Sequence, residues 1–191
     1  MSQANRAQTM AAKLAAYARR ARVADAPVLA AYSMALEPRL RGLGDIFHPD
    51  LLHPARNVLI LLEDAACRDA EVLAAAALTE TEFPELRVAA EQIRGALGNH
   101  VADLVQGIPQ PRELGAELTE ALVSLPEPAA LIAVAERLDH ARHLHFRAPE
   151  AWRPFHQQVV DVYLPFAARL NTALWERLAR WAGAFERRLD A

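Results

Sequence analysis

The chain has 191 residues, 53% of them hydrophobic, and a formal charge of -3 at pH 7. This length favours one domain with a sizeable core, and the lack of a basic excess argues against nucleic acid or an anionic membrane surface as a partner. The single cysteine, Cys67, excludes an intramolecular disulfide; because a signal peptide and an apolar run of membrane-spanning length are also missing, we expect a cytoplasmic protein.

Apolar residues recur at spacings of three and four along nearly the whole chain, without the alternation that is typical of strands. We therefore expect an all-α fold, a single-domain bundle of about eight or nine helices over residues 1–191. Leu14 belongs to a first helix. Pro27 suits the first turn of a second helix, which we expect to end near Pro38 and to be followed by a loop over residues 41–50.

Prolines and glycines divide the rest of the chain. Pro54 is placed to begin a third helix, with His53 held at the junction between loop and helix. The remaining predicted helices cover residues 69–78, 84 to 95 or 98, 99–105, 114–122, 128–145 and 152–189. The last of these contains Pro154 and Pro165, where a boundary or a kink is expected. Its apolar residues are interpreted as core or as the face of a homodimer.

Several sequence blocks follow one another in a characteristic order. They are His53-Pro54 before an apolar helix, then residues 72–80, 98–107 and 135–138, and finally the passage Ala148-Pro149-Glu150-Ala151-Trp152. Their order and spacing resemble the hydrolase domain of RelA/SpoT-type alarmone enzymes and their stand-alone small homologues, within the HD superfamily. The resemblance covers about residues 10 to 180 and implies that the predicted bundle is a single HD-like domain.

The resemblance implies a metal site. In that family a histidine before proline, an adjacent His-Asp pair and a later aspartate bind manganese and serve removal of the 3'-pyrophosphate from guanosine tetra- or pentaphosphate. The first ligand is matched by His53, the pair falls on Thr79 and Glu80, and the last aspartate falls on Glu136. Thr79 thus stands where a histidine is expected.

A further ligand follows from helical spacing. Glu136, His140 and His143 lie at i, i+4 and i+7 of one predicted helix and so share a face. Together with His53 they could supply three nitrogens and one oxygen to a metal ion. The alternative is that histidines near a helix end interact with terminal carbonyl groups or with solvent. Our candidate metal ligands are therefore His53, Glu80, Glu136 and His140.

The resemblance also locates the catalytic positions. The Glu-Asp pair that activates water in the family falls on Phe83 and Pro84, and neither side chain can transfer a proton. Glu82 and Glu85 flank them and are catalytic candidates only if the local turn re-aims them. Arg142 keeps a basic residue near the expected nucleotide and is the candidate for contacting it.

The changed ligands argue against ordinary hydrolysis. A threonine hydroxyl is a weaker ligand than imidazole, and each replacement of Asp by Glu lengthens the side chain by about 1.5 Å. A misplacement of about 1 Å can lower a rate about a hundredfold. We therefore predict a catalytically degenerate HD-family domain with no metal or a weakly held one, which senses a guanine nucleotide or contacts another protein. The alternative is an active Mn-dependent phosphohydrolase of guanosine tetra- or pentaphosphate, or of a related nucleotide, with a rearranged metal site.

Overall fold

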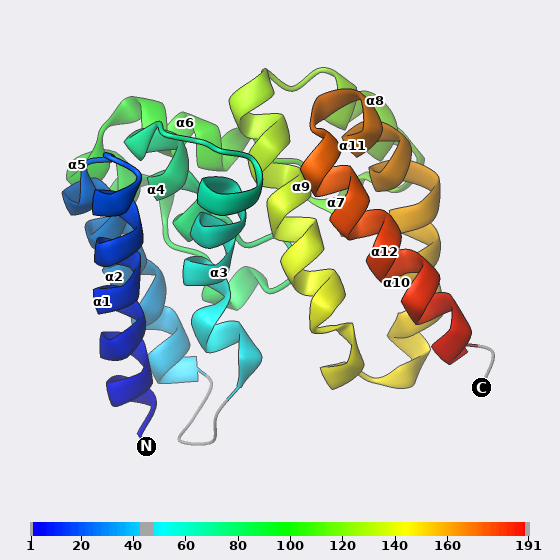
Figure 1. Ribbon diagram of the computed structural model, residues 1–191, viewed down its shortest axis with the longest axis horizontal. Helices are drawn as coiled ribbons and strands as arrows, with labels where there is room; N and C mark the ends of the chain where they lie inside the picture. The colour runs from blue at the N-terminus through cyan, green and yellow to red at the C-terminus, as the bar shows by residue number, and fades with distance from the viewer. Residues whose placement is uncertain (1, 43–47, 190–191) are drawn as a thin grey trace.

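The computed structural model describes residues 2–42 and 48–189, and all regular structure among them is helical (Figure 1). The prediction of an all-α fold is confirmed. The α-helices are α1 (Gln3–Arg20), α2 (Asp25–Gly42), α3 (His53–Leu59), α4 (Ala70–Leu78), α5 (Ala90–Leu97), α6 (Asn99–Gly107), α7 (Pro111–Leu114), α8 (Leu118–Val123), α9 (Glu127–Arg142), α10 (Trp152–Gln158), α11 (Leu164–Leu170) and α12 (Thr172–Leu189). Among the described residues, no helix has both the length and the apolar character needed to cross a membrane.

Helix α4 lies at the centre of the packing and contacts α2, α3, α6 and α9. Asp69 begins this helix by accepting hydrogen bonds from the backbone N–H groups of Glu71 and Val72 at 2.8 and 3.3 Å. Every residue from 72 to 78 is buried. Because four of them are consecutive alanines, the neighbouring helices can pack closely on all sides of α4.

The hydrophobic core continues from Ala7 in α1 to Phe185 in α12. Figure 1 shows α1 and α2 at one end of the molecule and α10 to α12 at the other, with α3 and α9 between them. Helix α9 contacts α3, α4 and α12. The polar residues of α3 and α9 therefore face one another in the interior of the fold.

The second helix is longer than the sequence predicts. It does not end near Pro38 but continues to Gly42 with Pro38 inside it. Proline removes only one helical hydrogen bond, and the buried side chain of Arg39 holds the last turns by donating to the carbonyl groups of Asp50 and Leu86. The loop expected over residues 41–50 lies partly outside the described residues.

Several boundaries in the middle of the chain also differ. Pro84 begins a short 3-10 turn, Pro84–Leu86, and α5 starts only at Ala90. Gly98, with φ of 90°, precedes α6, which continues to Gly107. The helix expected over residues 114–122 is divided into α7 and α8, and α9 ends at Arg142 before a 3-10 turn. Local turns at proline and glycine account for these shifts.

The C-terminal segment is interrupted in an unexpected place. Pro154 lies in the first turn of α10, where proline is tolerated, and it makes no break. Ahead of Pro165 the chain widens into a π-helical turn, Val159–Tyr163. The actual break is at Asn171, whose extended backbone ends α11 and whose side chain accepts a hydrogen bond from the N–H of Leu174 at 3.1 Å.

Candidate functional site

Four polar side chains meet where α3, α9 and the segment after α4 come together. His53, Glu80, Glu136 and His140 each offer one nitrogen or oxygen atom, and these atoms all lie within 4.8 Å of one another. Each residue is at most 3% exposed. The structure thus brings together all four residues that the sequence suggests as metal ligands, and we call them the His–Glu cluster.

Two helices fix the positions of three of these side chains, one by where it begins and the other by its helical period. His53 is the first residue of α3 and follows a 3-10 turn, Pro49–Leu52. Glu136 and His140 are one turn apart on α9, so their side chains lie one above the other. Glu80 lies in the short non-helical segment that crosses the interior after α4 has ended.

His53 is held in a defined orientation. Its Nδ1 lies 2.8 Å from Oδ2 of Asp139, and Nδ2 of Asn57 donates to its Nε2 at 3.0 Å. The proton of the neutral ring therefore belongs on Nδ1. Arg56 makes two hydrogen bonds to Asp139, at 2.6 and 2.9 Å. A carboxylate that fixes the tautomer of a histidine in this way is typical of histidines that bind metals.

Burial alone raises the pKa of the Asp139 carboxyl. The hydrogen bond from His53, together with Arg56, outweighs burial and holds this pKa well below its usual range. Asp139 is therefore ionised at neutral pH.

Glu80 already has a cationic partner. Its Oε2 accepts a hydrogen bond of 2.7 Å from Arg39, a side chain that is 1% exposed. Its Oε1 accepts from the backbone N–H groups of Glu82 and Phe83 at 3.0 and 3.1 Å. Burial raises the pKa of Glu80, but His140, His53 and Arg39 together lower it well below its usual range. Glu80 is therefore an ionised carboxylate whose two oxygens both accept hydrogen bonds from the protein.

Glu136 is similarly engaged. Its Oε1 accepts from both the backbone N–H and the hydroxyl of Thr81, at 3.0 and 2.5 Å. Burial raises its pKa, whereas His140 and Arg137 lower it, and the net direction is downward. Thr81 thus fixes Glu136 across the 55 residues that separate them.

His140 lies between the two glutamates. Its Nε2 is 3.0 Å from Oε1 of Glu136 and 3.3 Å from Oε1 of Glu80, and its ring stacks on His53 with centroids 4.3 Å apart. Although both oxygens are close, neither makes a well-aligned hydrogen bond with this buried nitrogen. Burial lowers the pKa of His140, but the two carboxylates outweigh it and raise the pKa to about 10.

The cluster fits a divalent cation in its donor types but not in its charge. Imidazole and carboxylate groups suit Mn²⁺ or Zn²⁺, and the poorly aligned Nε2 of His140 has the position of a ligand atom. However, Arg39 neutralises Glu80, and the raised pKa of His140 provides a proton between Glu80 and Glu136. A metal ion would have to displace that proton and compete with the arginine.

The remaining predicted residues lie around the cluster. The hydroxyl of Thr79 donates to the carbonyl group of Ala75 at 2.9 Å and so belongs to the end of α4. His143 is not in the cluster, contrary to the expected helical face: α9 ends at Arg142, and His143 Nδ1 lies 2.8 Å from the carbonyl oxygen of Asp139. The expected set of three nitrogens and one oxygen is in fact two nitrogens and two oxygens.

The two catalytic candidates, Glu82 and Glu85, and the nucleotide-binding candidate, Arg142, lie in different places. Glu82 is buried and ion-paired with three arginines, whereas Glu85 is exposed on the 3-10 turn. Arg142 is exposed. Together with Arg56 and Arg177 it lines a cavity that none of the four cluster residues reaches. The turn therefore aims Glu82 inward and Glu85 outward.

The sequence does not single out the residues that hold the cluster together. Arg39, Asp139 and Arg147 are the partners of Glu80, His53 and Glu82. Asp139 could have been suspected from the sequence, since it stands beside His140 within the same motif. Arg39 and Arg147 could not, because their partners are 41 and 65 residues away in the chain.

A cavity of about 330 Å³ lies outside the cluster and reaches His140. Its aromatic walls are Phe83 and Phe146, and its basic groups are Arg112, Arg147 and the imidazoles of His48 and His143. Phe146 is 59% exposed. We call this the outer cavity. Its volume is within the roughly 300 to 1,000 Å³ of small-molecule pockets.

The sequence matches no protein-family model, and no curated protein shows significant similarity to it.

Proposed function

We propose that this chain is a catalytically degenerate domain of the HD type, similar to the RelA/SpoT hydrolase domain, which acts by binding a guanine nucleotide rather than by hydrolysing it. The observation that carries the proposal is the buried ion pair between Arg39 and Glu80. It supplies positive charge where an active member of that family would use a metal ion.

The surroundings of Glu82 also favour loss of hydrolysis. A general base must accept a proton from water near the reacting phosphate. Burial raises the pKa of Glu82, but Arg137 and Arg147 outweigh it and lower the pKa to about 2. A carboxylate with such a low pKa and with three guanidinium partners is a poor proton acceptor.

The outer cavity supports the binding role. It places aromatic rings and basic side chains directly outside the cluster, and a nucleotide needs both, the rings for its base and the cations for its phosphates. A protein partner is the alternative ligand of this domain. The two differ in a thermal melt, since only the first predicts stabilisation by nucleotide alone.

Metal analysis and an activity assay test the proposal together. We expect the purified chain to carry no stoichiometric metal and to release no pyrophosphate from guanosine tetraphosphate with Mn²⁺. Saturating guanosine tetraphosphate should still raise the melting temperature, because a ligand at 100 times its dissociation constant stabilises the folded state by about 2.7 kcal/mol. Stoichiometric manganese together with rapid turnover would refute the proposal.

An active metal-dependent phosphohydrolase is the second candidate. It is favoured by the four donor atoms within 4.8 Å and by the orientation of His53 by Asp139. The variant T79H/E80D, which restores the His-Asp pair of the family, distinguishes the two. If the ligands have been altered as we propose, the variant should bind Mn²⁺ at least about tenfold more tightly than the unmodified chain, measured by calorimetry. Tight binding by the unmodified chain would favour the enzyme.

A further inference from the structure

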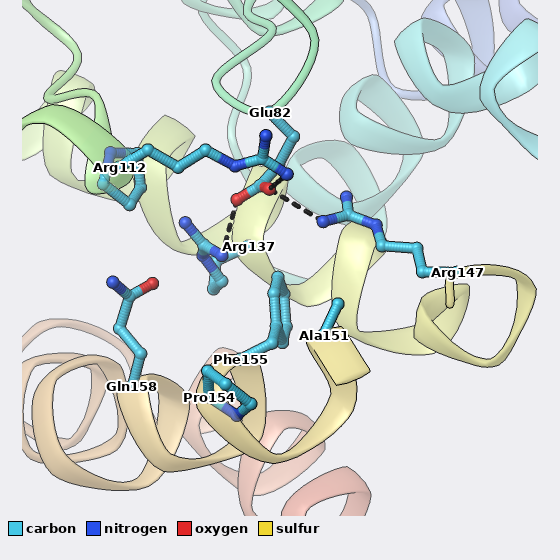
Figure 2. A pocket seen from close by; sticks show the side chains of 9 residues that line it. Glu82, Arg112, Arg137, Arg147, Ala151, Pro154, Phe155 and Gln158 are labelled. Atoms are coloured by element: carbon cyan, nitrogen blue, oxygen red, sulfur yellow. Dashed lines mark hydrogen bonds and ion pairs between the residues drawn. The ribbon is translucent and has the colours of Figure 1, made fainter. Parts of the chain in front are cut away.

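Three arginines converge on one buried carboxylate beside a second, smaller cavity (Figure 2). Glu82 is paired with Arg137 at 2.9 Å, with Arg147 at 2.7 Å and with Arg112 at 3.2 Å. A single carboxylate neutralises only one of these three permanent positive charges. The group therefore keeps an excess of two positive charges at the wall of the cavity.

The cavity has about 200 Å³ and is lined by these four charged residues together with Ala151, Pro154, Phe155, Gln158 and Pro111. We call it the arginine cavity. Figure 2 shows the charged groups on one side and Phe155 and Gln158 opposite them. Its volume is below the roughly 300 Å³ at which drug-sized pockets begin. It therefore suits a small ligand or one end of a larger one.

The arginines retain capacity for a ligand. Arg137 is fully buried, yet its Nε has no hydrogen-bond partner among the described residues. Its guanidinium stacks against Phe155 and Tyr163, 4.6 and 4.7 Å from the ring centroids, which fixes its position. Arg112 is 64% exposed at the rim and can turn toward an incoming group. One cation is thus rigid and one is adaptable.

Gln158 adds a neutral donor. It is half-buried at the C-terminal end of α10, and no hydrogen bond ties its amide to another described residue. Its side-chain NH2 group can donate to an oxygen atom in the cavity. Guanidinium groups match the geometry of phosphate oxygens in pairs.

We propose that the arginine cavity binds a small phosphate-type anion, held by Arg112, Arg137 and Arg147 and oriented by Gln158. This inference deepens the binding role proposed above and rests on it. It requires no metal ion. The arginine cavity shares Arg112, Arg147 and Ala151 with the outer cavity. The anion can therefore be a free inorganic ion or the phosphate end of a larger molecule whose remainder occupies the outer cavity.

Calorimetric titration with pyrophosphate, in buffer with EDTA at fixed ionic strength, tests the site on the full chain. We expect saturable one-to-one binding, and binding of acetate at least about tenfold weaker. R112Q should weaken pyrophosphate binding about tenfold, equivalent to the loss of one charged contact. R19Q is the matched control, because Arg19 is 65% exposed and is also paired with one carboxylate, Asp25. It should bind as the unmodified chain does.

Q158E provides a second, independent variant. It keeps the shape of the side chain and places a negative charge in the cavity, so pyrophosphate binding should fall at least about tenfold while circular dichroism stays unchanged. The proposal is overturned if pyrophosphate gives no saturable heat, or if R112Q and Q158E both bind it like the unmodified chain. Equal losses in R112Q and R19Q would also overturn it, since they indicate nonspecific attraction.

A parallel titration with guanosine diphosphate separates the two sources of the anion. Tighter binding than pyrophosphate supports the site as the phosphate end of a nucleotide, and equal binding supports a free anion. Failure of this inference is distinguishable from failure of the proposed function. Because EDTA removes metal ions, the titration does not depend on a metal ion in the His–Glu cluster, whereas turnover with Mn²⁺ would refute the proposed function and leave the titration unchanged.

Discussion

Replacing Arg39 by methionine tests the idea that a buried cation holds the site together. Arg39 is 1% exposed and donates to the carbonyl groups of Ala35, Asp50 and Leu86 at 2.9, 3.0 and 3.3 Å, as well as to Glu80 at 2.7 Å. R39M leaves Glu80 as a buried anion without its arginine. Removing one partner of a buried ion pair costs about 3–5 kcal/mol.

The expected loss is a large part of the stability of an ordinary domain, which is about 5–15 kcal/mol. Since each kcal/mol corresponds to roughly 2–4 °C in a domain of this size, R39M should lower the melting temperature by about 10 °C. Urea unfolding followed by circular dichroism measures the free energy directly. R41M on the same helix is the control, because Arg41 is 71% exposed and its pair with Glu37 contributes about 0.5 kcal/mol or less.

The charge explanation has its own check. E80Q in the R39M background removes the unpaired anion, so the double variant should be more stable than R39M alone. If R39M unfolds within about 1 kcal/mol of the unmodified chain, the charge of Glu80 is neutralised by something other than Arg39, and the reasoning about the cluster is refuted.

Further predictions concern pH and packing. The pKa of His140 is raised from 6.5 to about 10 on folding. Its contribution to stability is therefore complete below pH 6.5 and is lost as the pH rises through 10. In H140Q, the free energy of unfolding measured in urea should depend less on pH over this range than in the unmodified chain. The pKa of Glu82 is lowered from 4.5 to about 2, so its contribution is complete above pH 4.5 and is lost toward pH 2; E82Q should lose less stability than the unmodified chain over this range. D139A removes the acceptor at Nδ1 of His53, and nitrogen NMR should then detect a change from the Nδ1–H tautomer; an unchanged spectrum would contradict the proposed orientation of the ring. A74L adds volume to a side chain that is 0% exposed and should destabilise the chain by about 1–3 kcal/mol in a urea titration, whereas a stability equal to that of the unmodified chain would reveal unfilled space beside α4.

The fold was predictable where local chemistry decides it. The periodic apolar residues predicted the helices, and Pro54 and Asp69 mark the beginnings of α3 and α4 correctly. The sequence misled at Pro38, because tertiary contacts of the next residue keep α2 intact beyond it. It gave no warning of the break at Asn171, since a capping asparagine resembles any exposed polar residue of a helix.

The sequence predicted which four residues form the candidate site, but not which groups neutralise their charges. Spacing along α9 placed Glu136 beside His140, and the order of motifs added His53 and Glu80. The sequence could not indicate that arginines neutralise the carboxylates, because the partner of Glu80 is 41 residues away and that of Asp139 is on another helix. Whether a group of acids binds a metal ion or an arginine depends on these distant contacts.

Arg147 connects the arginine cavity with the buried His–Glu cluster. One nitrogen of its guanidinium donates to Glu82 at 2.7 Å in the arginine cavity, and another lies 3.0 Å from Nδ1 of His140 in the buried cluster. A molecule that pulls this guanidinium outward moves a positive charge away from His140 at the same time. If such binding changes the proton affinity of His140, reciprocity requires that protonation of His140 change the affinity for the bound molecule by the same factor. Through Arg147, the protonation state of the buried His140 and binding in the arginine cavity would then influence each other.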